Sequence, residues 1–240
     1  MDLKEAISVD AEEVERFSRI ADEWWDVRGK FRPLHQINPV RVGYINELAS
    51  KKFGGLSGLS ILDIGCGGGL VCEPLARLGG KVCGVDASEK NIAVAKIHAQ
   101  TSNLDINYQV AAAEMLAAEG QQFDVVLALE IIEHVADVES FLKACTGLVR
   151  PGGLLVLSTM NRTAKSFALA IVGAEYILRW LPRGTHNWRK FLRPSEIDEL
   201  VRKQGMNFED LRGMVWNPFK DVWSLSKDVD VNYLIAYVRT

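Results

Sequence analysis

One short segment constrains the fold of this chain more than any other. Residues 60–64 read Ser-Ile-Leu-Asp-Ile, an apolar β-strand, and they run directly into the glycine-rich stretch 65–69. Glycines at a turn allow positive φ angles and let a ligand approach the backbone closely. A strand that passes through such a turn into a helix is typical of ligand-binding α/β domains. The segment therefore predicts an α/β fold with a ligand at this turn.

The glycine spacing separates this loop from two classes of phosphate-binding loop. A dinucleotide-binding loop has glycine at its first, third and sixth positions, and counting from Gly65 the sixth position is Leu70. No Gly-Lys-Ser/Thr sequence follows, so the loop is not a P-loop. A carboxylate just before the glycines suits a cationic ligand tail and repels a pyrophosphate. The candidate ligand contacts in this loop are Asp63, Gly65, Gly67 and Gly69.

Further candidate contacts follow from where the next strands end. Asp86 closes the strand at 81–86, where its carboxylate can accept hydrogen bonds from both hydroxyls of a ribose. The alternative is that Asp86 only caps the helix that follows. Ala113 and Glu114, in the loop after the third strand, are expected beside an adenine, and Leu129 beside a methionine moiety. Together with the acid-glycine loop, these positions predict S-adenosylmethionine as the cofactor.

Strands and helices alternate through the middle of the chain. The alternation predicts right-handed βαβ units and a doubly wound, mainly parallel sheet. Two late strands with no helix between them suggest an antiparallel hairpin at the sheet edge. We therefore expect seven strands in a Rossmann-like arrangement that resembles the class I methyltransferase fold. The predicted strands are 60–64, 81–86, 106–110, 123–129, 153–158, 211–216 and 231–238, and the predicted helices between them are 70–78, 88–99, 138–148 and 194–203.

The remaining residues are expected to surround this core within a single domain, 1–240. The first 55 residues are predicted to form a cap of two helices, one in the first 25 residues and one at 39–52, joined by a loop over 26–39. The other parts are a cofactor-binding core at 56–160, an apolar insertion or lid at 161–193, and a C-terminal helix with antiparallel strands at 194–240.

Bulk composition narrows the class of partner and compartment. The net charge of −3 and a pI near 5.9 argue against nucleic acid as the main partner. The four cysteines show no paired or zinc-like spacing, which favours buried thiols in a reducing compartment. The amino terminus lacks the pattern of a signal or transit peptide. These features predict a cytoplasmic protein.

Glu130, Glu133 and His134 form the polar cluster most suggestive of chemistry. Their i, i+3, i+4 spacing would place them on one face of a helical turn, at the carboxyl end of a strand where open α/β sheets bind ligands. Two carboxylates and an imidazole are candidate catalytic residues and candidate ligands for a divalent cation such as Mg²⁺ or Mn²⁺. The alternatives are acids that cap a helix start, or a His134 that acts as a base without metal.

Residues 165–183 are the most apolar part of the chain outside the expected sheet. They read KSFALAIVGAEYILRWLPR, and arginines and lysines flank them. The segment is too short to span a bilayer. Its composition favours a helix that lies in a membrane interface, or an apolar lid over a hydrophobic substrate, rather than a helix that packs only against the core.

Taken together, several segments resemble one known family, the ubiquinone biosynthesis O-methyltransferases, over nearly the whole length. The glycine loop is generic to methyltransferases, whereas the motifs at 33–41, 173–186 and 229–233 are specific. The matching stretches are WWD at 24–26, PLHQINPVR at 33–41, DIGCGGG at 63–69, EIIEHV at 130–135, GAEYILR at 173–179, GTH at 184–186 and VDVNY at 229–233.

The resemblance implies an enzyme that methylates catechol-type hydroxyls of polyprenylated ubiquinone precursors, at the 2-polyprenyl-6-hydroxyphenol and 3-demethylubiquinol steps. It implies that Arg41, Gly65, Asp86 and Leu129 contact the cofactor, and a guanidinium at position 41 suits the cofactor's carboxylate. At Leu129 the chain departs from some relatives, which carry Met.

The resemblance also implies a metal site and partners. The family's proposed divalent-cation site matches Glu130, Glu133 and His134. A polyprenylated catechol substrate implies contact with the inner face of the cytoplasmic membrane through 165–183, and a complex of ubiquinone biosynthesis enzymes is a further expected partner.

The expected reaction is in-line methyl transfer from the sulfonium to a phenolate oxygen, with the metal or His134 promoting deprotonation. Lys165 and His186 are weaker candidates for the base. The rival hypotheses are an O- or C-methyltransferase acting on another hydrophobic phenol or quinone, and a non-catalytic S-adenosylmethionine-binding partner of a biosynthetic complex. The acidic pI and the lack of an Asn/Asp-Pro-Pro-Tyr/Phe motif disfavour an RNA methyltransferase.

Overall fold

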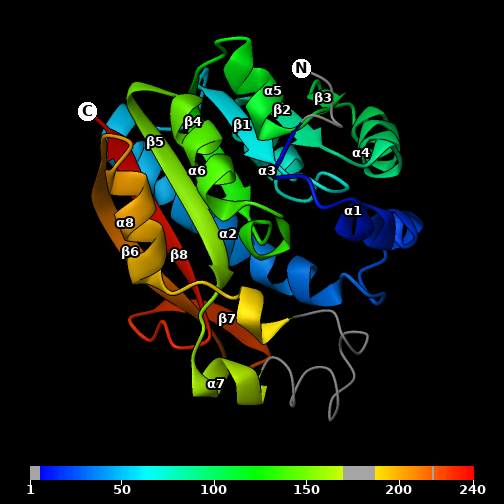
Figure 1. Cartoon of the computed structure of the whole chain (residues 1–240). Coiled ribbons are helices and arrows are strands. Elements are labelled where there is room, and N and C mark those ends of the chain that lie inside the picture. The colour runs from blue at the N-terminus through cyan, green and yellow to red at the C-terminus, as the bar shows by residue number, and fades with distance from the viewer. Residues whose placement is uncertain (1–5, 170–186, 218) are drawn as a thin grey trace.

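The structure, a computed structural model, describes residues 6–169, 187–217 and 219–240 and is built around one β-sheet (Figure 1). Its strands are β1 (Ser60–Ile64), β2 (Lys81–Asp86), β3 (Asn107–Val110), β4 (Phe123–Leu129), β5 (Val149–Met160), β6 (Met206–Asn217), β7 (Val222–Ser226) and β8 (Asn232–Arg239). They lie in the order β3-β2-β1-β4-β5-β8-β6-β7. Strands β1 to β5 are mutually parallel, and β8, β6 and β7 are antiparallel to their neighbours. The predicted α/β, mainly parallel fold is confirmed.

Helices cover both faces of the sheet, which explains why its central strands are apolar throughout. One face packs against α2 (Arg32–Phe53), α3 (Cys72–Arg77) and α4 (Glu89–Thr101). The other packs against α5 (Ala113–Ala118), α6 (Val138–Gly147) and α8 (Pro194–Arg202). All of β4 is buried between these two layers. Two further helices, α1 (Ala11–Ser18) and α7 (Ala164–Ser166), lie outside the layers (Figure 1).

The expected count of seven strands is wrong, because the C-terminal region supplies three strands instead of two. β6 and β8 pair in antiparallel fashion as predicted, but they are not a simple hairpin, since β7 comes between them in the sequence. The additional strand, β7, forms a hairpin with β6 in which Trp216 lies opposite Trp223. β7 spans only five residues, and its alternation includes two serines, so its apolar signal is short and weak.

The loop predicted over 26–39 is also wrong, since α2 begins at Arg32 and contains Pro39 in its interior. Pro33 stands in the first turn, where backbone N–H groups have no partner inside the helix and proline is tolerated. Pro39 removes one hydrogen bond, but the helix continues because its buried side chains pack on the sheet. The first helix is shorter than expected and ends at Ser18, before a single 3₁₀ turn over Ala21–Glu23.

The apolar segment 165–183 begins on a capped turn and then leaves the described part of the chain. Thr163 accepts a hydrogen bond from the Ser166 backbone and caps α7. Phe167 and Leu169 follow as exposed apolar residues, 47 % and 54 % accessible. The predicted helix over the rest of this segment, and His186, lie outside the described residues.

Gly213 in β6 lies too close to the loop before β8 to carry a side chain. A Cβ atom built there would lie 1.7 Å from the carbonyl oxygen of Asp228. We expect Gly213→Ala to lower the free energy of unfolding by about 1–3 kcal/mol, because the backbone must shift to relieve the contact. Gly43→Ala, in the exposed interior of α2 with nothing within 4 Å, should instead raise it by about 0.5–1 kcal/mol. Urea denaturation of both variants tests this, and equal stability of the two would contradict it.

Candidate active site

A cavity of about 910 Å³ opens at the carboxyl ends of the parallel strands. This is where open α/β sheets bind ligands, because the strand-to-helix loops converge there. Its wall includes most residues predicted from the sequence to contact cofactor, metal or substrate: Arg41, Asp63, Gly65, Gly67, Asp86, Ala113, Leu129, Glu130, Glu133, His134 and Lys165. Gly69 and Glu114 are not part of that wall.

Gly69 and Glu114 have structural partners elsewhere. The Gly69 backbone has a φ of +88° and lies against the Tyr108 hydroxyl, which leaves no room for a side chain. One carboxylate oxygen of Glu114 accepts a hydrogen bond from the Ser8 backbone N–H at 3.2 Å. Through this contact Glu114 holds the segment before α1 against α5.

The glycine loop is covered directly by the amino-terminal segment. A Cβ atom at Gly67 would lie 2.3 Å from the Trp24 ring, and one at Gly68 would lie 2.5 Å from Trp24. The Trp25 indole N–H donates to the Gly68 carbonyl at 2.9 Å. Trp24 therefore packs on the loop where it has no side chains, and Trp25 forms a hydrogen bond to its backbone. The sequence did not predict this role for either residue.

Asp86 has a positioning role as well as a place in the cavity wall. One carboxylate oxygen accepts the Gly67 N–H at 3.0 Å, and the other accepts the Ser88 N–H at 2.8 Å and the Asn91 side-chain amide at 3.2 Å. Burial raises the pKa of Asp86, and these hydrogen bonds oppose the rise. Asp86 therefore supports the start of α4 and also lines the cavity, so the two alternatives do not exclude each other. The residue that caps α4 is Ser88.

Arg41 is a buried cation with spare hydrogen-bonding capacity. It is 3 % exposed, and Nη2 donates to Asn38 Oδ1 at 3.1 Å, whereas Nε has no partner among the described residues. Burial lowers the pKa of Arg41, and the nearby carboxyls of Glu130 and Asp63 raise it. Burial also raises the pKa of Asp63 to about 6, against the opposing effects of the Cys72 thiol and Arg41. A buried guanidinium with a free N–H suits a ligand that brings its own carboxylate.

The acid-histidine cluster does not form the helical turn expected from its spacing. Only Ile132–His134 form a 3₁₀ turn, and Glu130 has a φ of +54°, a left-handed conformation unusual for a residue other than glycine. Glu130 accepts a hydrogen bond from the Ser158 hydroxyl at 2.8 Å. Glu133 is 4 % exposed and accepts one from the Thr159 hydroxyl at 2.7 Å.

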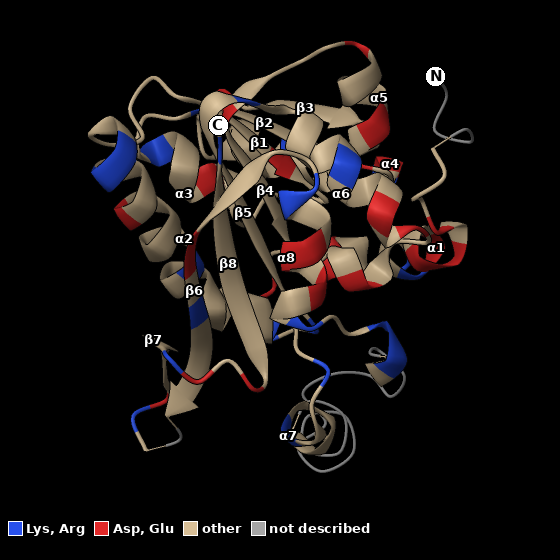
Figure 2. Cartoon of the chain, turned by 60° about the vertical axis from the view of Figure 1, so that its left-hand side comes forward, with Lys and Arg blue, Asp and Glu red and all other residues tan. Residues whose placement is uncertain are grey.

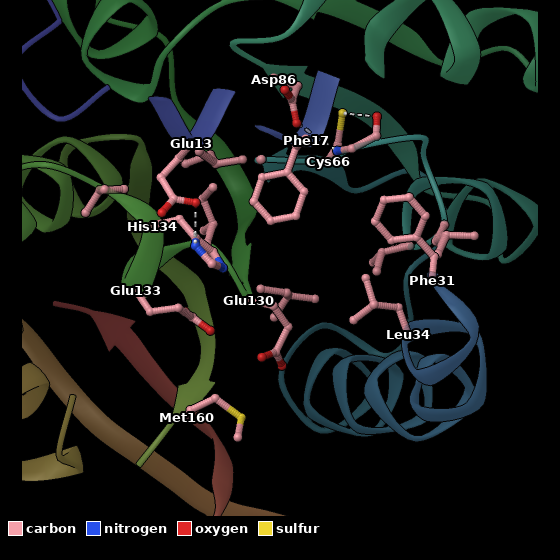
Figure 3. A pocket seen from close by; sticks show the side chains of 18 of the residues that line it. Glu13, Phe17, Phe31, Leu34, Cys66, Asp86, Glu130, Glu133, His134 and Met160 are labelled. Carbon is pink, nitrogen blue, oxygen red and sulfur yellow. Dashed lines mark hydrogen bonds and ion pairs between the residues drawn. The ribbon is translucent and has the colours of Figure 1, made fainter. Parts of the chain in front are cut away.

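His134 faces a helix that sequence reasoning did not connect with it. Its Nδ1 lies 3.2 Å from Glu13 Oε2 and 3.4 Å from Arg16 Nη2, both on α1 (Figure 3). Burial disfavours ionisation of Glu13, but His134, Arg16 and Lys190 together lower its pKa. Lys190 also bonds to Asp10, so the acidic helix α1 is held against the basic turn Trp188–Lys190 (Figure 2).

These partners bear directly on the predicted metal site. The three side chains contact different groups. Glu130 and Glu133 accept hydrogen bonds from Ser158 and Thr159, and His134 lies beside Glu13. Among the residues that the structure describes, no three His, Cys, Asp or Glu side chains are grouped so that they could hold a metal ion. In this arrangement the cluster does not fit a three-ligand cation site.

The burial of Glu133 has a consequence for stability. Burial raises the pKa of Glu133 to about 7, against the opposing effect of His134, so the native state binds this proton more tightly than the unfolded chain, where the value is near 4.5. The contribution is complete below about pH 4.5 and is lost as the pH rises through about 7.

We therefore expect Glu133→Gln to flatten the decline of unfolding free energy between about pH 5 and 7.5 relative to the native sequence. Urea denaturation across that range measures the slope, with the exposed Glu139→Gln on α6 as the matched control. Parallel curves for Glu133→Gln and the native protein would contradict the assignment.

Comparisons with known proteins agree on the fold and on the family. The methyltransferase domain family matches residues 62–157. A ubiquinone biosynthesis O-methyltransferase of Brucella anthropi is 54 % identical over 239 residues, covering 97 % of this chain and 96 % of the relative. A protein of the same name from Brucella ovis is 53 % identical with the same coverage.

A solved structure with bound S-adenosylhomocysteine, the magnesium protoporphyrin IX methyltransferase of Synechocystis, superposes with a TM-score of 0.71 at 21 % identity. The match covers 96 % of this chain and 100 % of that one. At this identity the likeness supports the fold.

Proposed function

Because the chain belongs to the family of ubiquinone biosynthesis O-methyltransferases, we propose that its acceptor is a catechol-type hydroxyl on a polyprenylated ubiquinone precursor. The chain is an S-adenosylmethionine-dependent O-methyltransferase. One observation carries the proposal: a buried Arg41, whose Nε–H has no partner among the described residues, and the polar groups Glu130, Glu133 and His134 line the same cavity. Residues that suit the cofactor and residues that can accept a proton from a hydroxyl thus line a single cavity.

The residues on the glycine-loop side fit S-adenosylmethionine. Arg41 suits the carboxylate of its methionine part and Asp63 its cationic amino group. Asp86 is held by Gly67 and Asn91 at the end of β2, where it suits the ribose hydroxyls. Ala113 and Leu129 supply apolar wall beside these groups.

Methyl transfer requires that the acceptor hydroxyl lose its proton as oxygen attacks the methyl carbon. S-adenosylmethionine supplies the methyl group, and the products are a methyl ether, S-adenosylhomocysteine and one proton. The protein contributes chiefly by holding the two reactants in line. We assign the proton to His134, whose imidazole lies in the cavity wall with Nδ1 3.2 Å from Glu13 Oε2 (Figure 3).

His134→Gln is therefore expected to lower kcat by about 10²-fold or more, since this is the usual contribution of a general base. The affinity for S-adenosylhomocysteine should stay within about twofold, because His134 belongs to the acceptor side. The assay follows methyl transfer to a prenylated catechol, and calorimetry measures the cofactor product. An unchanged kcat would remove His134 from this role.

The same assay with a chelator tests the divalent cation that the family resemblance implies. A rate that EDTA abolishes and Mg²⁺ restores would mean that Glu130, Glu133 and His134 turn towards a shared ion in the loaded enzyme. A rate that EDTA leaves unchanged would mean that deprotonation proceeds on the protein's own groups. Glu130→Ala separates the two cases, because it removes a metal response only if that response depends on this carboxylate.

The place of action that we propose is the inner face of the cytoplasmic membrane. A polyprenylated acceptor resides in the bilayer, and the segment 165–183 is apolar with basic flanks. Its first described residues, Phe167 and Leu169, are exposed. No helix among the described residues is long and apolar enough to cross a membrane.

Phe167→Glu with Leu169→Glu is expected to reduce binding to anionic vesicles by at least about tenfold, because each side chain loses the free energy of entering an apolar phase. Liposome flotation measures the bound fraction. The matched control is Ile97→Glu, which changes a 65 % exposed residue on α4, away from this segment. Equal flotation of the double variant and the control would count against the interfacial role.

A further inference from the structure

The cavity extends well beyond the groups that fit the cofactor. Asp86 and Met160 lie at opposite ends of it, with Glu130 and Glu133 between them (Figure 3). Past Glu130 the wall passes from the end of β5 to the β6–β7 hairpin and the start of β8. We call this part the distal sector, and its apolar lining residues include Met160, Leu169, Met214, Trp216, Trp223 and Val231.

The hairpin presents a continuous apolar stripe to the distal sector. Met214 and Trp216 are two residues apart on β6, so they lie on one face of the strand. Trp223 pairs directly with Trp216 and therefore shares that face. Trp223 packs against the same hydrophobic cluster as Met214, which α2 completes from the other side. The stripe is thus a supported wall of the cavity.

The polar groups of the distal sector are largely engaged with one another. Asn232 Oδ1 accepts the Met214 backbone N–H at 3.2 Å. Lys165 is paired with Asp228 at the rim, where both side chains are about 40 % exposed. The described donor without a partner is the buried indole N–H of Trp223. Apart from that N–H, the sector mainly offers a ligand apolar surface.

We propose that the distal sector binds the first isoprene units of the acceptor's tail, along the stripe formed by Met214, Trp216 and Trp223. This inference rests on the proposed function and adds the path of the tail to it. The tail leaves the reaction centre past Met160 and reaches the surface beside Leu169 and the Lys165–Asp228 pair. At about 910 Å³ the cavity is near the upper limit for a single small ligand, so it has room for cofactor and acceptor together.

Tail binding at this stripe makes a prediction about chain length. Each buried methylene strengthens binding by about fourfold, so adding one five-carbon isoprene unit to a methyl-substituted catechol should lower KM by at least about tenfold. kcat should change little, since the catechol ring and His134 are unaffected. The gain should level off once the enclosed stripe is filled.

The test compares kcat/KM for a methyl-substituted and a geranyl-substituted catechol, in the native protein and in Met214→Gln. This substitution keeps the side-chain length and places an amide in the apolar stripe, so the preference for the geranyl acceptor should fall by about tenfold. The control is Val222→Gln, on the same hairpin but 54 % exposed and absent from the cavity wall. Retained affinity for S-adenosylhomocysteine shows that each variant is folded.

A second measurement on the native protein needs no substitution. A catechol with a diazirine at the end of its first isoprene unit should label the peptide 206–226, which contains β6 and β7. An unchanged geranyl preference in Met214→Gln, or labelling confined to residues 14–34 beside α1, would overturn the tail path. Failure of the native protein to methylate either catechol would instead count against the proposed function itself.

Discussion

The contact between the amino-terminal segment and the glycine loop determines how this site can work. Trp24 lies where side chains at positions 67 and 68 would be, and Trp25 bonds to the Gly68 carbonyl. The packing of the protein itself therefore requires a loop without side chains at these positions. Trp24 also stacks on Phe31 at 3.8 Å and donates to Asn91 Oδ1 at 2.9 Å, so it joins the segment to α4. A cofactor bound at this loop, as we propose, would lie beneath a cover that belongs to the same chain.

The amino-terminal segment also places charged side chains beside His134. Through Glu13 and Arg16, α1 places a carboxylate and a guanidinium beside His134, and Lys190 ties the helix to the turn Trp188–Lys190. The segment that covers the glycine loop and the groups that contact the imidazole are thus one structural unit. Displacing α1 would break the contacts of His134 with this segment.

Local sequence patterns predicted the parts of the fold that depend on local rules. The glycine turn after Asp63, the five parallel strands and the capped helix at Ser88 all follow from short-range features. β7 was missed because five residues with two serines carry little periodic signal. The start of α2 was missed because Pro39 reads as a boundary, whereas tertiary packing holds the helix through it. The metal site was predicted on the assumption that Glu130, Glu133 and His134 share one helical turn. Glu130 instead has a positive φ angle and lies outside the turn Ile132–His134. The Glu13–His134 contact joins residues more than a hundred positions apart, and no spacing rule could have revealed it.

We propose that one cavity holds the cofactor under the amino-terminal cover and the acceptor on the side of the β6–β7 hairpin. The most direct test is a crystal structure with S-adenosylhomocysteine and a prenylated catechol. We expect the cofactor carboxylate at Arg41, the ribose at Asp86, a catechol oxygen within hydrogen-bond reach of His134, and the tail along Met214 and Trp223. A catechol bound between α1 and Phe31, or a cofactor carboxylate that avoids Arg41, would contradict it.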